Sequence, residues 1–158
     1  MTTEKYQHLI GKSGEVRIFE VERGAIKRYA YATDDDNPLY WDDEYAAASK
    51  HGDIIAPPGF FGWPCKFSGG MPFADRIIEE TVEVLAAEGF TRILDGGIAY
   101  EFHRPAKAGD KLAALTKVSS VQEKEGKSST MVMANLETTF TNQNGDLVAK
   151  QIKTVILR

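Results

Sequence analysis

The feature that most constrains the fold is a series of four extended runs that occupies most of the chain after Gly97. In the third run, residues 129–140, every second side chain is apolar or threonine, and alternate side chains of a strand share one face. Asn144-Gly145 is a strong hairpin signal between the last two runs. The second half of the chain therefore predicts an antiparallel series of strands. The runs are Gly97–Phe102, Lys111–Val121, Ser129–Phe140 and Leu147–Leu157.

The first half of the chain changes from strand spacing to helical spacing. Asp42 and Asp43 suit the positive N-terminal end of a short helix, and Gly89 is placed to end a longer amphipathic one. Ile54–Phe61 is expected to be an extended entry into a buried helix, with proline near the first turn. The other predicted elements are a strand at Glu15–Val21 and helices at Glu22–Tyr31, Glu44–Ser49 and Pro72–Glu88.

One strand, then helices, then a run of strands predicts an α+β fold, in which a curved antiparallel sheet of about five strands packs on a helix. The 158 residues contain no linker, internal repeat or low-complexity tract, so residues 1–158 are expected to form a single domain. A sheet with one helical face leaves open edges, and pairing with another copy or partner is therefore expected.

Charge and composition remove several classes of function. The 19 basic and 23 acidic side chains form no basic stripe, so no nucleic-acid partner is expected. The N-terminus lacks an apolar signal core, and no apolar run approaches the length of a membrane span. Cys65 stands alone, which rules out an internal disulfide, and no Cys/His spacing predicts a metal site. We expect a cytoplasmic protein without a metal or cofactor.

The segment from Asp34 to Tyr40, Asp-Asp-Asp-Asn-Pro-Leu-Tyr, is the most unusual polar stretch. A carboxylate in a partly buried loop can act as a general acid or base. The same acids can also simply cap a helix, turn the chain and solvate a loop. A calcium loop is disfavoured because its glycine and its closing glutamate are absent. From the residues alone, both the catalytic and the structural interpretations stay open.

The second candidate is Ala56-Pro57-Pro58-Gly59-Phe60. The N-terminus of a helix presents unpaired backbone N–H groups, and Gly59 would let a ligand approach that backbone closely. Such donors can polarise a carbonyl oxygen and stabilise an enolate-like oxyanion. An ordinary helix start after a tight bend is the alternative.

Two further residues are candidates for substrate binding. Trp63 lies in an aromatic-rich stretch beside the predicted oxyanion site, where an acyl chain would need an apolar slot, although core packing explains such residues equally well. His103 stands at a strand end, from which it could reach Asp35 across the fold or across a dimer interface. A strand-end histidine without chemistry is the alternative.

Taken together, Ala32–Tyr40, Trp41–Ala46 and Ile55–Phe60 resemble the MaoC-like hydratase/dehydratase family of hot-dog folds. The similarity is to its N-terminal type, the FAS1-like dehydratase domain. Tyr100–Asp110 is similar to the family's segment between two central strands. The resemblance extends from about Gly14 to Leu157 and implies a single hot-dog unit, with the sheet wrapped on a central helix, that works as a pair of hot dogs.

The resemblance also implies site residues. Active members carry Gly-Asp-x-Asn-Pro-Leu-His, whose Asp and His are catalytic. Asp35 matches that Asp, Asn37 matches the Asn, and Tyr40 stands where the family has His. A tyrosine, with an ordinary pKa of about 10, is a far poorer base near neutral pH than a histidine. We therefore expect Asp35, Asn37 and Tyr40 at the catalytic position, and Pro58, Gly59, Phe60, Trp63 and His103 around the substrate.

The implied function is a subunit of an (R)-specific enoyl-thioester hydratase or 3-hydroxyacyl-thioester dehydratase of fatty-acid metabolism. Its substrate would be an acyl-CoA or acyl carrier protein thioester. The chain would form a homodimer or a heteromer with another MaoC-like subunit, and its Tyr40 favours the substrate-binding half of such a pair. The alternatives are a non-catalytic acyl-thioester-binding or structural subunit, and a hot-dog thioesterase.

Overall fold

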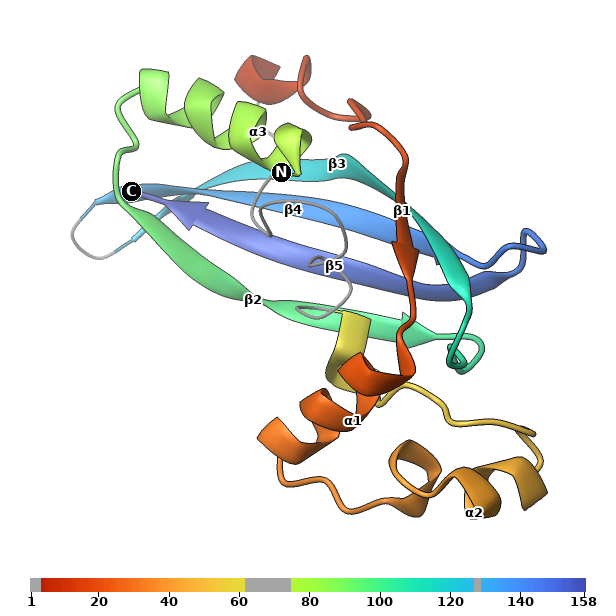
Figure 1. The fold of residues 1–158 in the computed structure, drawn as a ribbon. Coiled ribbons are helices and arrows are strands. Elements are labelled where there is room, and N and C mark those ends of the chain that lie inside the picture. The colour runs from red at the N-terminus through yellow and green to blue at the C-terminus, as the bar shows by residue number, and fades with distance from the viewer. Residues whose placement is uncertain (1–3, 62–74, 127–128) are drawn as a thin grey trace.

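A five-stranded antiparallel sheet forms the body of the protein (Figure 1). The computed structural model describes residues 4–61, 75–126 and 129–158. The strand order is β1-β3-β4-β5-β2, so β1 and β2 form the two edges of the sheet. The strands are β1 (Arg17–Glu20), β2 (Ile93–Phe102), β3 (Lys111–Glu125), β4 (Thr130–Thr141) and β5 (Leu147–Leu157).

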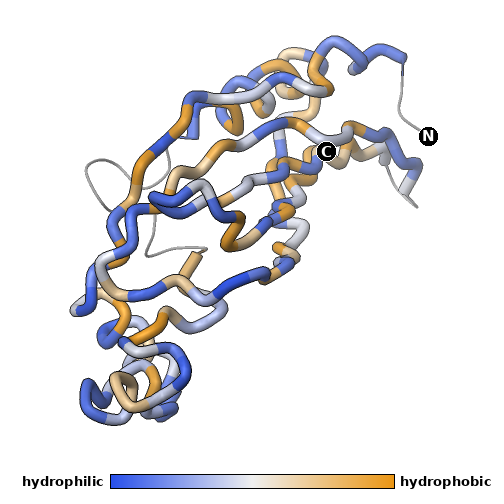
Figure 2. The backbone as a smooth tube through the Cα atoms, turned by 90° about the vertical axis from the view of Figure 1, so that its right-hand side faces the viewer, coloured by the Kyte–Doolittle hydropathy of each residue, from blue (hydrophilic) through white to orange (hydrophobic). Residues whose placement is uncertain are grey.

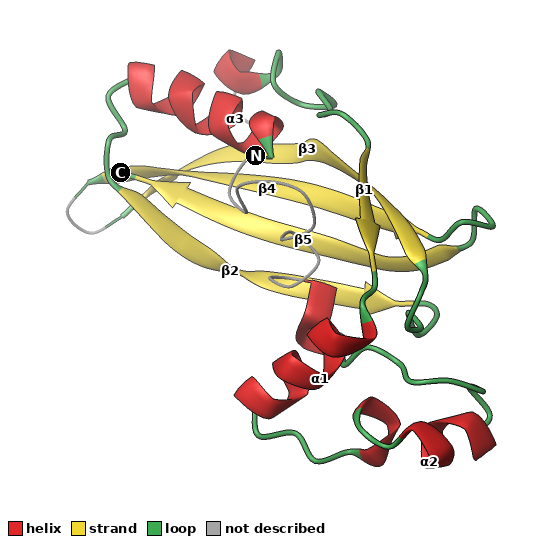
Figure 3. Ribbon diagram, in the orientation of Figure 1, coloured by secondary structure: helices red, strands yellow, loops and turns green. Residues whose placement is uncertain are grey.

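The helices gather in two places. The longest described helix, α3, lies over one end of the sheet, whereas α1 and α2 form a lobe beyond the other end (Figure 3). The α-helices are α1 (Arg23–Ala32), α2 (Asp43–Ala48) and α3 (Arg76–Ala87). Three short 3₁₀ helices accompany them: η1 (Glu4–Tyr6), η2 (Pro38–Tyr40) and η3 (Pro58–Phe61). The expected α+β class is confirmed.

Strand periodicity decides which face of the sheet is buried. Along β4, residues from Val132 to Phe140 alternate between buried and half-buried, in agreement with the predicted apolar face. Hydrophobic and hydrophilic residues alternate along the strands in Figure 2 as well. Two buried clusters result. One joins α3 to β3, β4 and β5 around Leu85 and Leu136, and the other lies under α1 and η3 around Ile26 and Phe60.

The predicted turns are found where the sequence places them. Gly145 adopts φ 81° in the hairpin between β4 and β5, and Gly109 adopts φ 89° before β3. The backbone N–H of Gly89, at φ 97°, donates to Ala86 O after the end of α3. Each of these backbone conformations is one that glycine adopts without steric cost.

The start of β2 differs from the prediction. The strand begins at Ile93 rather than Gly97, and its register against β5 shifts between Asp95 and Ile98. Gly97 lies in this irregularity at φ 102°, so the glycine marks a bulge within the strand and not its beginning. Trp63 and the expected helix start at Pro72 lie outside the described residues.

Within the described residues, no helix combines the length and the apolar character needed to cross a bilayer.

Candidate functional site

The first candidate segment begins where α1 ends. Asp35 N donates to Ala30 O at 2.9 Å and Asp34 N donates to Tyr31 O at 3.2 Å, which is the hydrogen-bond pattern of a Schellman helix terminus. Asp34 occupies the left-handed position of this motif at φ 54°. This is where the related motif has glycine, which adopts that conformation most easily. The helix terminus therefore fixes the backbone that carries Asp35.

Hydrogen bonds within the loop hold the carboxylate of Asp35 in place. Its Oδ1 accepts from Asn37 N at 3.2 Å, and Asn37 Oδ1 accepts from Leu39 N at 3.1 Å. The indole Nε1 of Trp41 donates to Asp35 O at 2.7 Å. Asn37 thus caps η2 with its side chain while its backbone N–H contacts the Asp35 carboxylate.

Tyr40 lies at the end of η2 in the buried cluster under α1 and η3. Burial raises the pKa of its phenol, the negative charge of Asp35 raises it further, and a hydrogen bond with Asn37 opposes the shift. The structure therefore brings Asp35, Asn37 and Tyr40 together. A phenol with a raised pKa keeps its proton at neutral pH, so Tyr40 can donate a hydrogen bond but cannot act as a base there.

A pocket of about 320 Å³ opens beside this loop. Tyr31 and Trp41 contribute aromatic walls, with their rings 6.5 Å apart at 78°. Asp35 lines the pocket, but Pro58, Gly59 and Phe60 are not among its lining residues. The two sequence-predicted segments therefore do not share this pocket.

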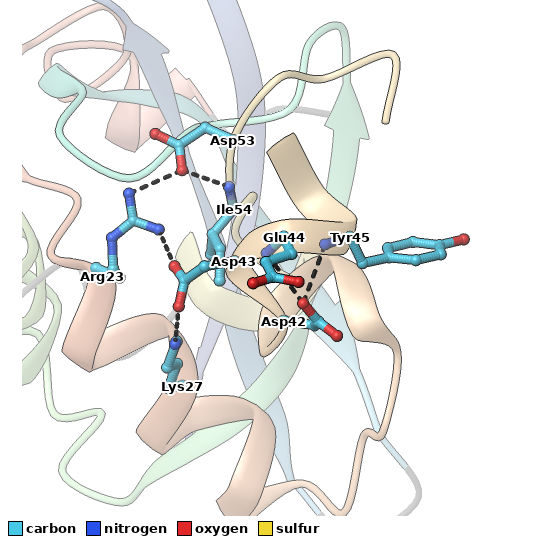
Figure 4. Close-up of polar contacts among 8 residues, drawn as sticks. All are labelled: Arg23, Lys27, Asp42, Asp43, Glu44, Tyr45, Asp53 and Ile54. Carbon is cyan, nitrogen blue, oxygen red and sulfur yellow. Dashed lines mark hydrogen bonds and ion pairs between the residues drawn. The ribbon is translucent and has the colours of Figure 1, made fainter. Parts of the chain in front are cut away.

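Charged side chains connect α1, α2 and the segment before Ile54 (Figure 4). Arg23 forms ion pairs with Asp43 and with Asp53, the latter at 2.8 Å. The hydrogen bond from Lys27, and then the nearby charges of Lys27 and Arg23, lower the pKa of Asp43. These contacts hold the lobe of α1 and α2 against the chain that leads to η3.

The N-terminus of α2 is capped as predicted. Asp42 Oδ1 accepts from Glu44 N and from Tyr45 N, each at 3.0 Å. Two of the otherwise unpaired N–H groups at the start of the helix are therefore satisfied.

The second candidate segment forms η3, and Pro58 is its first residue, as expected. Phe60 N donates to Pro57 O at 3.0 Å, so this N–H is occupied within the turn. Among the described residues, Gly59 N–H has no backbone acceptor. The expected pair of backbone donors is therefore reduced to Gly59.

The space above Gly59 is occupied by a residue that the sequence did not indicate. A β-carbon at Gly59 would lie 2.0 Å from the hydroxyl oxygen of Tyr29. The Tyr29 ring also meets Phe60 edge-on, with centroids 6.0 Å apart. Nothing in the sequence indicated that Tyr29, within the predicted helix Glu22–Tyr31, faces Gly59.

Short backbone bridges join the two segments to each other and to the end of β2. Ile55 N donates to Leu39 O at 3.2 Å, and Ala56 N donates to Ala106 O at 2.8 Å. His103 follows β2, and its Nε2 lies 3.2 Å from a carboxylate oxygen of Glu101. His103 therefore contacts Glu101, and no described contact joins it to Asp35.

Comparison with known proteins agrees with this architecture. The family model for the FAS1-like dehydratase domain region matches residues 8–151. The chain belongs to this family, and it shares its hot-dog fold with solved MaoC-like dehydratases. A UPF0336 protein of Streptomyces coelicolor is 33% identical over 121 residues, which cover 76% of this chain and 75% of the relative.

Two solved complexes from Mycobacterium tuberculosis share the fold. The ChsH1-ChsH2 complex matches with a TM-score of 0.78 and 20% identity, over 91% of this chain and 83% of that chain. The C-terminally truncated HadBC (3R-hydroxyacyl-ACP dehydratase) complex matches with a TM-score of 0.68 and 23% identity, over 99% of both chains. The predicted family and fold are confirmed, and both of these similar structures are complexes of different subunits.

Proposed function

We propose that this chain is the substrate-binding subunit of an (R)-specific enoyl-thioester hydratase or 3-hydroxyacyl-thioester dehydratase that acts on acyl-CoA or acyl carrier protein. A MaoC-like partner would supply the imidazole base. The observation that carries the proposal is the grouping of Asp35, Asn37 and Tyr40, in which the carboxylate is retained but the third group is a phenol whose pKa is raised.

The chemistry of hydration supports a division of labour. Water addition to an enoyl thioester needs a base for the water and an acid for the α-carbon. In the related motif an aspartate and a histidine share these roles, whereas here Asp35 is accompanied by Tyr40, which holds its proton at neutral pH. Gly59 N–H, without a described backbone acceptor, remains a candidate donor to the thioester oxygen. These groups are compatible with a complex in which this chain binds the thioester and a partner transfers the protons.

The edge of the sheet formed by β2 is the surface that we expect the partner to occupy. Among the described residues β2 pairs with β5 alone, so the strand is an edge of the described sheet, and a sheet edge is where another chain can add a strand. It also exposes large apolar side chains, which is unusual for a surface left in water. These are Ile93, Leu94, Ile98 and Phe102.

The test is hydration of a trans-2-enoyl-CoA by the purified chain, with and without a histidine-bearing MaoC-like partner. We expect little turnover by the chain alone and rapid turnover by the mixture. Asp35→Asn in this chain should reduce the rate of the mixture. Rapid hydration by the isolated chain, abolished by Asp35→Asn, would instead identify a self-sufficient enzyme.

A second candidate is a non-catalytic acyl-thioester-binding or structural subunit, and the raised pKa of Tyr40 also favours it. In that case the mixture would be active, and changes at Asp35 or Gly59 would leave its rate unchanged. Release of free thiol from a saturated acyl-CoA would point to thioester hydrolysis instead.

A further inference from the structure

The hydroxyl of Tyr29 reaches from α1 to the backbone of η3. It lies so close to Gly59 that a β-carbon there would approach it to 2.0 Å, a separation that real side chains do not tolerate. The Tyr29 ring is held by edge-on contact with Phe60 at 85°. Gly59 is therefore needed to make room for this hydroxyl, and the hydroxyl has a defined place beside the Gly59 peptide.

Nothing in the described structure uses this hydroxyl. No hydrogen bond joins it to another described residue, although polar groups in partly buried positions normally find a partner. Tyr29 and Gly59 are both half-buried, so each keeps part of its surface exposed. Burial raises the pKa of the Tyr29 phenol, which therefore keeps its proton and is available as a donor at neutral pH.

We propose that the Tyr29 hydroxyl donates a hydrogen bond to the carbonyl oxygen of the bound acyl thioester and is thus a further substrate-binding residue. The inference rests on the proposed function, because it assigns the ligand from that chemistry. A thioester carbonyl gains negative charge as its α-carbon loses a proton. A fixed O–H donor beside Gly59 N–H would stabilise that charge.

Binding of butyryl-CoA labelled with ¹³C at the thioester carbonyl tests the inference directly. This saturated probe cannot be hydrated, so the measurement does not depend on turnover or on a catalytic partner. The protein is used as the full chain in the assembly in which it purifies. A donor to the carbonyl oxygen lowers the C=O stretching frequency and moves the ¹³C resonance downfield.

Tyr29→Phe removes the hydroxyl and keeps the ring that contacts Phe60. We expect this variant to lose most of the carbonyl shift and to bind the probe up to about tenfold more weakly, the effect of one hydrogen bond. Tyr45→Phe is the matched control, because Tyr45 is a tyrosine of α2 that is 54% exposed and whose ring points away from the contacts between α1 and α2 (Figure 4). It should leave both quantities unchanged. Gly59→Ala displaces the hydroxyl and should therefore lose the carbonyl shift as Tyr29→Phe does.

The outcomes distinguish a failure of the inference from a failure of the proposed function. If the wild type binds the probe with a shifted carbonyl and Tyr29→Phe shows the same shift and affinity, the inference is wrong while the proposed function stands. If the wild type binds no acyl-CoA in any assembly, the proposed function and the inference both fail. Equal loss of the shift in Tyr45→Phe would show that the loss is not specific to the Tyr29 hydroxyl and would also overturn the assignment to Tyr29.

Discussion

Asp34 joins the end of α1 to the candidate site, because it directly precedes Asp35. It holds a left-handed conformation at φ 54°, and among the described residues it is the only non-glycine residue with positive φ. Such a conformation costs an L-residue roughly 1–2 kcal/mol. The hydrogen bonds that end α1 hold it there, and through it they set the position of Asp35.

We therefore predict that Asp34→Gly stabilises the protein by about 0.5–1 kcal/mol, because glycine adopts this conformation without strain. Urea denaturation measures the difference in the free energy of unfolding. Asp36→Gly is the matched control, since Asp36 is also exposed but does not have positive φ. It should not stabilise. A gain in both variants would show that loss of negative charge, and not relief of strain, is responsible.

Tyr6 provides a prediction about pH. Its ring is buried and its hydroxyl donates to Glu123 at 2.9 Å. Burial, followed by Glu123, raises the pKa of Tyr6 from 10.0 to about 12. Since the folded state holds this proton more tightly than the unfolded chain, the stabilisation is complete below pH 10 and is lost as the pH rises toward about 12.

We expect the free energy of unfolding of the wild type to fall across this alkaline window. Tyr6→Phe lowers stability by about 1 kcal/mol at neutral pH through the lost hydrogen bond, but its stability should fall less steeply in alkali. Denaturation curves at a series of pH values give both slopes. Parallel slopes in the two proteins would mean that Tyr6 does not carry the effect.

At the scale of elements, the lobe of α1 and α2 is joined to the rest of the chain by exposed charges. Arg23 contacts Asp43 and Asp53 with a side chain that is 44% exposed. Exposed ion pairs contribute little individually because water and salt screen them. Position, and not stability, is therefore their main effect: they fix the lobe that carries Asp35 relative to the segment that carries Gly59.

Arg23→Gln should accordingly lower the free energy of unfolding by no more than about 1 kcal/mol, and the loss should shrink in high salt. Arg28→Gln is the control on the same helix, because its nitrogen lies 4.0 Å from Glu22 and its side chain is 74% exposed. Thermal unfolding at low and high salt gives the comparison. A loss in Arg23→Gln that salt does not change would contradict a screened surface contact.

At the scale of the whole molecule, the two edges of the sheet differ. β1 has four residues, whereas β2 has ten and exposes several large apolar side chains. The longer apolar edge can bury more surface and form more backbone hydrogen bonds with a partner.

Ile98→Glu on β2 should therefore weaken the assembly by placing a charge in the buried interface. Light scattering after size-exclusion chromatography would show a fall in mass at the same protein concentration. Ile18→Glu on β1 is the control, since Ile18 is 61% exposed and lies on the opposite edge. Equal dissociation of both variants, or of neither, would contradict an interface at β2. Circular dichroism should confirm that both variants remain folded.

Several elements could be predicted because the residues that specify them lie close together in the sequence. The alternation from Thr130 to Phe140 fixed the buried face of β4, and Asn144-Gly145 marked the hairpin that follows it. The same local reasoning placed the start of β2 wrongly at Gly97. A glycine in an extended run marks either an end or a bulge, and only pairing with β5 distinguished the two.

The sequence by itself determined the α+β class, the family and the loop that holds Asp35, Asn37 and Tyr40, because periodicity, turn residues and motif order act over short distances. Tertiary structure alone decided the surroundings of those residues. It raised the pKa of Tyr40 by burial and brought Tyr29 from α1 against Gly59. These are contacts between segments far apart in the chain or effects of water exclusion, and no local pattern of residues encodes them.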